Sequence, residues 1–281
     1  MGGLSRAAVA AVAAAVLVVV ATAAAGTLAT TQAGAAPGPS TASPQLPGGR
    51  AYTLHAANWT GGARPLVVAL HGVGQSAARM AQITGLDAIA DTYRLVVAYG
   101  QAAGTGARWN AGSCCGSTEQ DEVSYVRAVV ADAAARTPVD LTRVYVVGYS
   151  NGGMLAWRLA CQARDLVAAV AVVAGALLVP CRSTPAVRAY HIHGTGDATV
   201  PLAGGRGFEG RTFPDSRTEP ARVGPGSTVR QHWFAGGHLW PAWATPTVLS
   251  WLLRYRVIGS ATPRPPAKPG PVPINSLTAA G

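Results

Sequence analysis

The sequence predicts a single α/β domain in which a mostly parallel sheet is covered by helices on both faces. Short runs of β-branched and apolar residues alternate with segments of helical periodicity, and the runs are apolar at successive positions, as in strands buried on both sides. The 281 residues are enough for one sizeable core, and 49% are hydrophobic against 12% charged. This composition excludes a disordered, highly charged chain and a coiled coil.

Six strands and four helices account for most of this pattern. Because chemistry in such sheets gathers at the carboxyl ends of the strands, functional side chains are expected in the segments that follow them. The strands are expected at 65–70, 95–99, 143–147, 167–173, 187–192 and 229–234, and the helices at 76–90, 122–135, 152–161 and 246–255.

The first 36 residues have the layout of a secretory signal peptide. One cation precedes the apolar stretch 7–25, and small residues suited to cleavage follow, up to Ala25 and again at 33–36. An uncleaved membrane anchor is the alternative, since about 20 apolar residues span a bilayer. Alanine-rich segments insert less readily than leucine-rich ones, so we expect a secreted, extracellular protein without stable membrane association after cleavage.

The remaining chain divides into three parts. Pro, Gly, Ser and Ala dominate residues 37–49, which predicts a flexible leader. Six prolines between 263 and 273 predict a disordered, Pro-rich tail over 259–281. The α/β domain is then expected at 50–258, and we expect it to be a monomer.

The charge pattern argues against nucleic acid as a partner. Lys and Arg total 22 and Asp and Glu total 12, so the net charge is +10. The cations are scattered singly, whereas nucleic-acid-binding proteins gather them along one face or helix. The sequence therefore predicts a basic surface without a nucleic-acid groove.

Four cysteines fit an oxidising compartment. An even number in an exported chain suggests two disulfides, for which three pairings are possible. Zinc is the alternative, but two adjacent cysteines are not C-x-x-C spacing and no histidine pair follows at finger distance. We expect disulfides of unknown pairing and no metal among Cys114, Cys115, Cys161 and Cys181.

A G-x-S-x-G pattern stands directly after the strand expected at 143–147. Gly148 and Gly152 lie two residues on either side of Ser150, and an amphipathic helix follows. Such a turn is so sharp that side chains at both flanking positions would collide, hence glycine. The pattern alone is weak in a chain with 34 glycines, and its place between strand and helix makes it specific.

Two further side chains at strand ends complete a nucleophilic constellation. A nucleophilic serine needs a base, and the base needs an orienting carboxylate. Asp197 follows the strand at 187–192 and His238 follows the strand at 229–234, so the order Ser150, Asp197, His238 is that of α/β-hydrolases. Taken alone, Asp197 is equally well a turn former and His238 a loop histidine. Together the three predict a catalytic triad on an α/β-hydrolase fold.

A tetrahedral oxyanion needs two preorganised N–H donors. We expect one from the backbone of Asn151 and the other from the loop after the first strand, at Val73 or Gly74. The same loop spells Gly72-x-Gly74-x-x-Ala77, which resembles a dinucleotide fingerprint. The next strand ends without the acid that would hold a ribose hydroxyl, so no cofactor is expected.

The other histidines have structural interpretations. His71 and His193 flank the expected site but precede glycine turns, which favours positioning roles over proton transfer. His55, His191 and His232 fall within strand patterns, where a packing histidine is the default.

These motifs together resemble the polyhydroxybutyrate depolymerase-like esterases, a group that merges with secreted feruloyl and acetylxylan esterases. The resemblance covers about residues 50–256 and implies Ser150, Asp197 and His238 as the triad of a serine esterase. Two departures are Asp121-Glu122 where the family usually has two aspartates and Tyr99-Gly100 where it often has Y-P-D-G. The blocks are Val68–Gly72, Trp109-Asn110 with Cys114–Gly116, Asp121–Val126, Gly148–Met154 with Ala160-Cys161, His193–Asp197 and Gly237–Pro241.

The resemblance implies an ester substrate, either a hydroxyalkanoate oligomer or an acylated plant polysaccharide. Trp109 and Trp240 lie beside the catalytic loops in sequence and are candidate walls for a feruloyl ring or a sugar face, with a packing role as the alternative. Without a second domain for gripping solid polymer, soluble esters are favoured. A catalytically silent binding protein and a peptidase stay open, because a fold does not choose its substrate.

Overall fold

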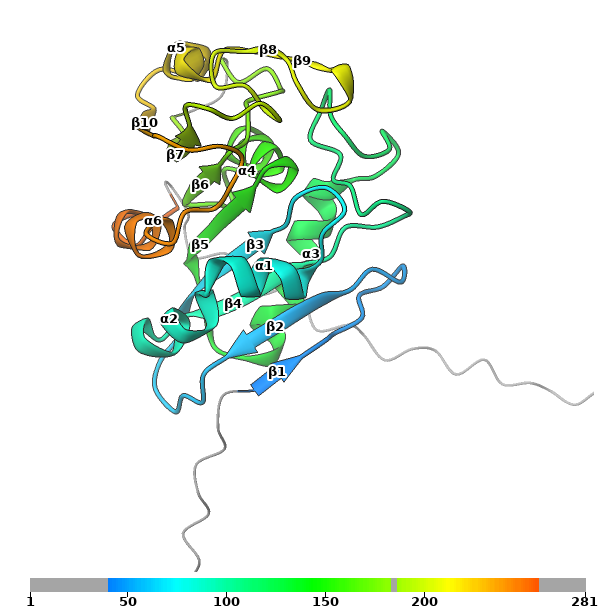
Figure 1. Ribbon diagram of the computed structural model, residues 1–281. Helices are drawn as coiled ribbons and strands as arrows, with labels where there is room; N and C mark the ends of the chain where they lie inside the picture. The colour runs from blue at the N-terminus through cyan, green and yellow to red at the C-terminus, as the bar shows by residue number, and fades with distance from the viewer. Residues whose placement is uncertain (1–39, 183–185, 258–281) are drawn as a thin grey trace, which may run out of the picture. The chain divides into compact units, whose positions relative to one another are not determined.

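The computed structural model describes residues 40–182 and 186–257, and these form an eight-stranded sheet with helices on both faces (Figure 1). The strand order is β1-β2-β4-β3-β5-β6-β7-β10. In this order, each pair of adjacent strands from β4 through β3, β5, β6 and β7 to β10 is parallel. The pairs β1 with β2 and β2 with β4 are antiparallel. The predicted signal peptide, and the predicted tail from residue 259, lie outside the described residues.

The elements follow one another in the alternating order that the sequence predicts. The strands of the sheet are β1 (Ser40–Ala42), β2 (Tyr52–Ala56), β3 (Arg64–Leu70), β4 (Val96–Gly100), β5 (Val139–Tyr149), β6 (Ala169–Val173), β7 (Arg188–Gly194) and β10 (Thr228–Phe234). The short strands β8 (Gly205–Arg206) and β9 (Thr212–Phe213) pair separately. The helices are α1 (Ala77–Thr84), α2 (Leu86–Tyr93), α3 (Glu122–Arg136), α4 (Asn151–Gln162), α5 (Glu219–Arg222) and α6 (Ala244–Leu252), with 3₁₀ turns at Phe208–Gly210 and Ser216–Thr218.

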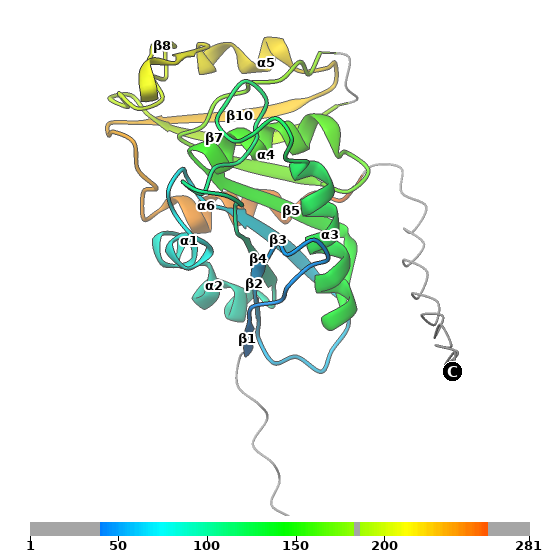
Figure 2. The ribbon, with the colours of Figure 1, turned by 90° about the vertical axis from the view of Figure 1, so that its right-hand side faces the viewer.

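The core consists of two apolar layers, one on each face of the sheet. Helices α1, α2 and α6 cover one face, and α3 and α4 cover the other (Figure 2). Successive residues of β3 serve the two layers in turn, since Leu66 and Val68 pack on the α3 and α4 side and Val67 and Ala69 on the opposite side. This alternation explains why the strand is apolar at every position.

The six predicted strands and four predicted helical regions are confirmed, with shifted ends and one division. The helix expected at 76–90 is two helices, because Gly85 adopts φ +59° between α1 and α2. Its N–H bonds to the Ala81 carbonyl, which ends α1 with a left-handed glycine cap.

The prediction of a flexible leader over residues 37–49 is wrong for residues 40–49. Ser40–Ala42 form β1, which pairs with β2 from Ser40 opposite Ala56 onwards. The pairing occupies an edge of β2 that would otherwise present unpaired N–H and C=O groups. Leu46 is buried in the core, so its apolar side chain also holds this segment against the domain.

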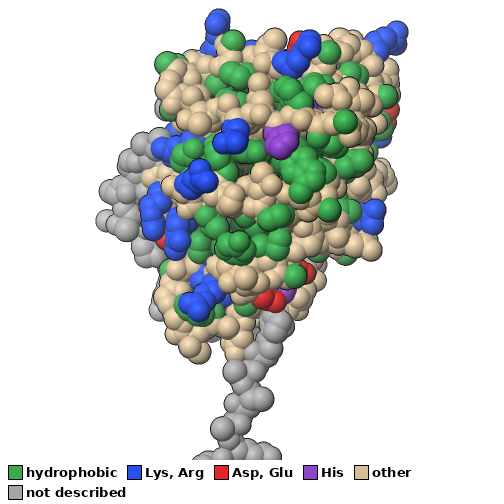
Figure 3. Space-filling view, turned by 60° about the vertical axis from the view of Figure 1, so that its left-hand side comes forward, with side chains coloured by type: hydrophobic (Ala, Val, Ile, Leu, Met, Phe, Trp, Pro, Cys, Tyr) green, Lys and Arg blue, Asp and Glu red, His purple; other side chains and the backbone are tan. Residues whose placement is uncertain are grey.

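The structure resolves the cysteine pairing that the sequence left open. Cys161 of α4 is joined to Cys181, and Cys114 is joined to its neighbour Cys115. The described residues hold no helix of the length and hydrophobicity that a bilayer crossing needs. On the face seen in Figure 3, Lys and Arg side chains lie in separate places between polar and apolar surface.

Replacing Cys161 and Cys181 together by serine is expected to lower the free energy of unfolding by about 3 kcal/mol, because the bond closes a loop of 20 residues and restricts the unfolded chain. Denaturant unfolding of both proteins measures the difference. A double variant as stable as the native protein would contradict the expectation.

Candidate active site

Ser150 occupies the sharp turn between β5 and α4. Its backbone has φ +54° and ψ −120°, a conformation that residues other than glycine rarely adopt. A Cβ at Gly148 would lie 2.1 Å from the Gly152 carbonyl oxygen, and a Cβ at Gly152 would lie 2.1 Å from that of Leu70. Both glycines are therefore required by close backbone approach, and the turn raises the Ser150 hydroxyl above the end of the sheet.

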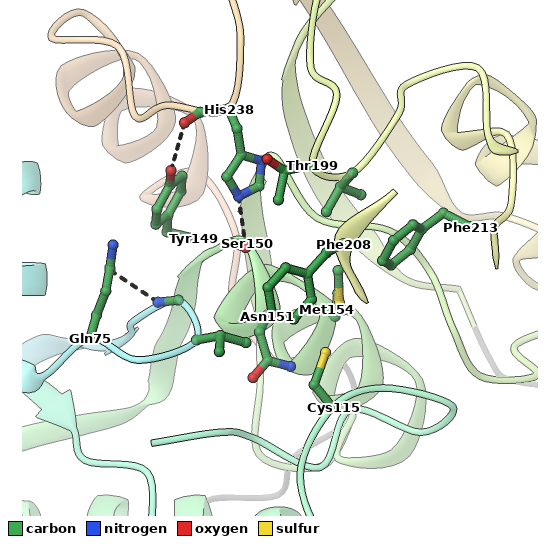
Figure 4. Close-up of a pocket in the computed structure, with 13 residues that line it drawn as sticks. Gln75, Cys115, Tyr149, Ser150, Asn151, Met154, Thr199, Phe208, Phe213 and His238 are labelled. Carbon is green, nitrogen blue, oxygen red and sulfur yellow. Dashed lines mark hydrogen bonds between the residues drawn. The ribbon is translucent and has the colours of Figure 1, made fainter. Parts of the chain in front are cut away.

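The three predicted triad residues meet above this turn. His238 follows β10 and lies with Nε2 2.8 Å from Ser150 Oγ (Figure 4). On the other side of the ring, His238 Nδ1 lies 2.7 Å from Asp197 Oδ2. These distances are within hydrogen-bonding range, so the ring can accept the serine proton at Nε2 while Asp197 accepts the hydrogen on Nδ1.

Asp197 is held as a carboxylate by a dense set of donors. Its Oδ1 accepts the backbone N–H groups of Thr199 and Val200 at 2.8 and 2.9 Å. Burial by itself raises the pKa of Asp197, but hydrogen bonds from His193, His238 and Val200 outweigh burial. The pKa of Asp197 therefore lies well below its ordinary value, and the group stays ionised at neutral pH.

The loops that carry Asp197 and His238 are tied to each other and to the turn at Ser150. The Thr195 N–H donates to the carbonyl of Phe234 at the end of β10, and the Gly196 N–H donates to the carbonyl of Gly236 in the loop that follows, both at 2.8 Å. The Tyr149 hydroxyl donates to the His238 carbonyl at 2.9 Å. Burial, with the nearby Asp197 charge, raises the pKa of Tyr149 to about 12, so the phenol keeps its proton.

The structure distinguishes the two candidates for the second oxyanion donor. The Gly74 N–H bonds to the carbonyls of Gly106 and Ala107 at 3.0 and 3.2 Å, so it is already occupied. The Val73 N–H has no acceptor within residues 40–182 and 186–257, and Val73 lines the same cavity as Ser150 and Asn151. The geometry thus favours Val73, with Asn151 at the first position of α4 as the other candidate.

The interpretation of Trp109 as a wall against the substrate is wrong. Its side chain is fully buried, between the rings of His71 and Tyr125, and does not line the cavity. Its indole N–H donates to the His71 carbonyl at 2.8 Å. The Asn151 side chain in turn bonds both the N–H and the carbonyl of Trp109, at 2.8 and 3.1 Å. Trp109 therefore connects the loop of Val73 to the start of α4.

Trp240 also lies away from the cavity. Its indole N–H donates to the Thr245 hydroxyl at 2.9 Å, and that hydroxyl donates to the Thr84 carbonyl at 2.6 Å. The ring packs on the core layer of α1 and α6, so the packing role is the one that the structure supports. Exposure depends on the tertiary structure, and neighbours in sequence do not report it.

His71 has the positioning role that its glycine neighbour predicted. Its Nδ1 lies 2.7 Å from the Gly72 carbonyl, and its Nε2 accepts the Ala102 N–H at 3.2 Å. Burial lowers the pKa of His71, so the ring is neutral with its proton on Nδ1. Both nitrogens are occupied, which leaves neither for proton transfer.

The walls of the cavity beside Ser150 come from residues that the sequence reading did not single out. The cavity has a volume of about 160 Å³, and the described residues that line it include no Lys, Arg, Asp or Glu (Figure 4). Phe208 and Phe213 belong to the segment between Asp197 and β10, where two of the chain's three phenylalanines stand among glycines and charged residues. This pair of aromatic residues in an otherwise polar segment is the sequence feature that could have indicated these walls. The apolar walls are made by Val73, Cys115, Met154, Val200, Phe208 and Phe213.

Comparison with known proteins relates this geometry to a family. The family model described as esterase PHB depolymerase matches residues 51–213. A protein of Nocardia uniformis subsp. tsuyamanensis named as an esterase, NocK, is 37% identical over 164 residues, which are 55% of this chain and 47% of that protein. Feruloyl esterase B of Piromyces equi is 32% identical over 109 residues, 36% of this chain and 19% of that protein. The chain spans less than half the length of these curated relatives.

The likeness extends to solved structures. The acetyl xylan esterase from Aspergillus awamori superposes with a TM-score of 0.57 at 14% identity, covering 76% of this chain and 98% of that chain. At this identity the likeness concerns the fold alone, which is the α/β-hydrolase fold. The segment matched by the family model contains Ser150 and Asp197, and His238 lies beyond its end.

Replacing Trp109 by phenylalanine is expected to lower kcat roughly tenfold with little change in KM for a short ester. The variant keeps a ring in the core but loses the hydrogen bond that holds the loop of Val73, and full loss of an oxyanion donor costs about 10²–10³ in kcat. Steady-state kinetics with a p-nitrophenyl ester measure both constants. Trp240→Phe, which loses a hydrogen bond away from the cavity, is the matched control. A raised KM for aromatic esters with native kcat would show that Trp109 contacts the substrate instead.

Proposed function

This chain belongs to the esterase PHB depolymerase family, and from that premise we propose that it is a secreted serine esterase that hydrolyses carboxylic esters through an acyl-enzyme. The observation that carries the proposal is the pair of hydrogen-bond distances through His238, 2.8 Å to Ser150 Oγ and 2.7 Å to Asp197 Oδ2. A silent binding protein would have no need of a strained serine aligned with a base and a buried carboxylate.

The first half-reaction forms the acyl-enzyme. Ser150 Oγ attacks the ester carbonyl carbon, and its proton passes to His238 Nε2. Asp197 accepts the Nδ1 hydrogen of His238 and stabilises the imidazolium that results. The carbonyl oxygen becomes an oxyanion, which the N–H groups of Val73 and Asn151 bind. When the carbon–oxygen bond to the alcohol breaks, His238 gives its proton to the leaving oxygen.

The second half-reaction returns the serine. Water attacks the acyl carbon while His238 takes one of its protons, and the same N–H groups bind the second oxyanion. Ser150 Oγ then leaves with the proton from His238, and the carboxylic acid is released. These steps use side chains and backbone groups of this chain and need no cofactor.

The cavity favours a short, uncharged acyl group. The cavity volume of about 160 Å³ is well below the ~300 Å³ of the smallest pockets that hold drug-sized ligands. The walls of the cavity are apolar. A hydroxybutyryl unit, as the family's name indicates, fits both properties. We therefore propose esters of short hydroxyalkanoates as the substrate class, with the alcohol side of the bond facing the open mouth of the site.

A feruloyl ester is the second candidate. Phe208 and Phe213 present two aromatic rings to the cavity, and rings of this kind pack favourably against an aromatic acyl group. The 32% identity to feruloyl esterase B supports this alternative over the matched segment. The acyl group of an acetylated polysaccharide is smaller still and also fits the cavity.

Secretion belongs to the same proposal. Both cysteine pairs of the described residues are disulfides, which persist in oxidising compartments. We propose that residues 1–36 direct export and are removed. Expression with these residues, followed by sequencing the N-terminus of the protein in the medium, tests this directly; retention in the membrane with an intact N-terminus would overturn it.

Ser150→Ala is expected to reduce kcat by roughly 10⁴–10⁶ and to abolish labelling by a fluorophosphonate probe. The reason is that the nucleophile is lost while the fold and the oxyanion donors stay. Ser250→Ala, at an exposed serine of α6, is the control and should hydrolyse esters and label as the native protein does. Near-native hydrolysis by Ser150→Ala would rule out the assignment.

A substrate panel is expected to rank hydroxybutyrate dimers and trimers above methyl ferulate in kcat/KM, because the cavity is small. Acetylated xylan and a peptide amide complete the panel, and the peptide should not be cleaved. Phe213→Ala enlarges the cavity, so it should raise the ratio of ferulate to hydroxybutyrate hydrolysis. Preference of the native protein for ferulate would instead assign the second candidate.

A further inference from the structure

A chain of buried hydrogen bonds continues behind Asp197, away from Ser150. His193 Nε2 lies 3.1 Å from Asp197 Oδ2 and 2.7 Å from the Val200 carbonyl oxygen. His193 Nδ1 lies 3.0 Å from His191 Nε2, and His191 Nδ1 lies 2.5 Å from Glu219 Oε2. The side chains of His191, His193, Asp197 and Glu219 are all 0% exposed.

The acceptors at the two ends determine where the protons lie. A carbonyl oxygen can only accept, so His193 Nε2 carries a hydrogen, which it donates to Val200, and the same N–H group lies 3.1 Å from Asp197 Oδ2. In the neutral ring, Nδ1 is then the acceptor, and it takes the hydrogen of His191 Nε2. The remaining nitrogen, His191 Nδ1, faces Glu219 at hydrogen-bonding distance, so one further proton lies between these two groups.

The proton between His191 and Glu219 means that no uncompensated carboxylate is buried at this end of the chain of hydrogen bonds. An uncompensated carboxylate in the interior costs several kcal/mol. With the shared proton, Glu219 and the two imidazoles together carry no net charge, and the other Glu219 oxygen accepts the Leu177 N–H at 3.1 Å. The rings of Trp157 and Trp233 pack around His191 and exclude water from the chain. Asp197 therefore keeps the net negative charge behind His238.

We propose that His193 is a positioning residue for the reaction, and that His191 and Glu219 hold it in the tautomer that donates to Asp197. This inference rests on the proposed function, because it concerns the same site. The partially positive N–H group of His193, 3.1 Å from Asp197 Oδ2, keeps that oxygen between His193 and His238. Strand packing alone requires neither the buried Glu219 nor two histidines bonded in series.

The arrangement is not that of a metal site. Within the described ranges, no three His, Cys, Asp or Glu side chains are placed to hold a metal ion. The ring nitrogens of His191 and His193 are all engaged with Glu219, with each other, or with Val200 and Asp197. The chain is therefore a set of hydrogen bonds directed at the carboxylate.

The decisive experiment removes the donor at position 193. His193→Leu should lower kcat about tenfold, the effect typical of losing an outer hydrogen-bond partner, with KM unchanged. Without that donor, more negative charge remains on Asp197 and stabilises protonated His238, so the acid limb of the kcat/KM profile should move to higher pH. His193→Gln supplies an amide donor, so it should restore both the native kcat and the native position of the acid limb. Ser150, Tyr149 and His193 contact Asp197 or His238. His191 and Glu219 lie behind His193, and the charge of Arg79 acts on Tyr149.

Controls separate positioning from packing. His232→Leu, on the exposed side of neighbouring β10, should leave kcat and the acid limb at their native values. Glu219→Gln keeps an acceptor for Leu177 and a donor for His191 and should retain native kcat, whereas Glu219→Leu should lower kcat by no more than His193→Leu does. A folded His193→Leu with native kcat and acid limb would overturn the proposal. So would a loss of kcat that leaves the acid limb in place and is not restored by glutamine.

Nitrogen-15 NMR of the histidine rings tests the native protein directly, even if His193→Leu does not fold. His193 Nε2 and His191 Nε2 should both carry a proton at neutral pH, and a bare His193 Nε2 would overturn the proposal. The spectrum does not depend on activity. If the native protein neither hydrolyses esters nor reacts with a fluorophosphonate, the proposed function fails while the tautomer of His193 can still be read.

Discussion

The close approach of backbone at the Ser150 turn is the constraint on which the rest of the site depends. The carbonyl groups of Gly152 and Leu70 leave no room for a Cβ at Gly148 or Gly152, so β5 and α4 meet at an angle that only glycine permits. That angle holds Ser150 at a positive φ and aims its hydroxyl at His238. Among the described residues, the first N–H of α4 has no acceptor, and it lies beside the hydroxyl, where the proposed reaction would develop negative charge.

Around this turn, buried polar groups are stabilised by pairing. Asp197 lies in the interior, yet its two oxygens receive hydrogen bonds from two backbone N–H groups and two imidazoles. These bonds outweigh the cost of burial, which is why the pKa of Asp197 is lowered although the residue is enclosed. The hydrogen bonds from His193 through His191 to Glu219 extend the same principle one layer deeper. His191, which the sequence suggests is a packing residue, is hydrogen-bonded at both ring nitrogens.

The candidate triad was predictable because each member has a local signal. Ser150 stands in a glycine-flanked turn, and Asp197 and His238 follow strands whose parallel pairing brings their ends to one edge. The interpretations of Trp109 and Trp240 depended on exposure, and exposure is set by which distant loops cover a ring. Sequence proximity to a site therefore could not show that one tryptophan is enclosed by His71 and Tyr125.

By itself the sequence determined the alternation of strands and helices, the turn at Ser150 and the chain order of the three candidate triad residues, because these follow from periodicity, glycine sterics and strand ends. The tertiary structure decided the pairing of Cys161 with Cys181. It also decided the choice of Val73 over Gly74, because the Gly74 N–H is taken by the carbonyls of Gly106 and Ala107. The tertiary structure also placed Phe208 and Phe213 in the walls of the cavity beside Ser150. Each of these is a contact between segments far apart in sequence, and such contacts leave no period or local pattern to read.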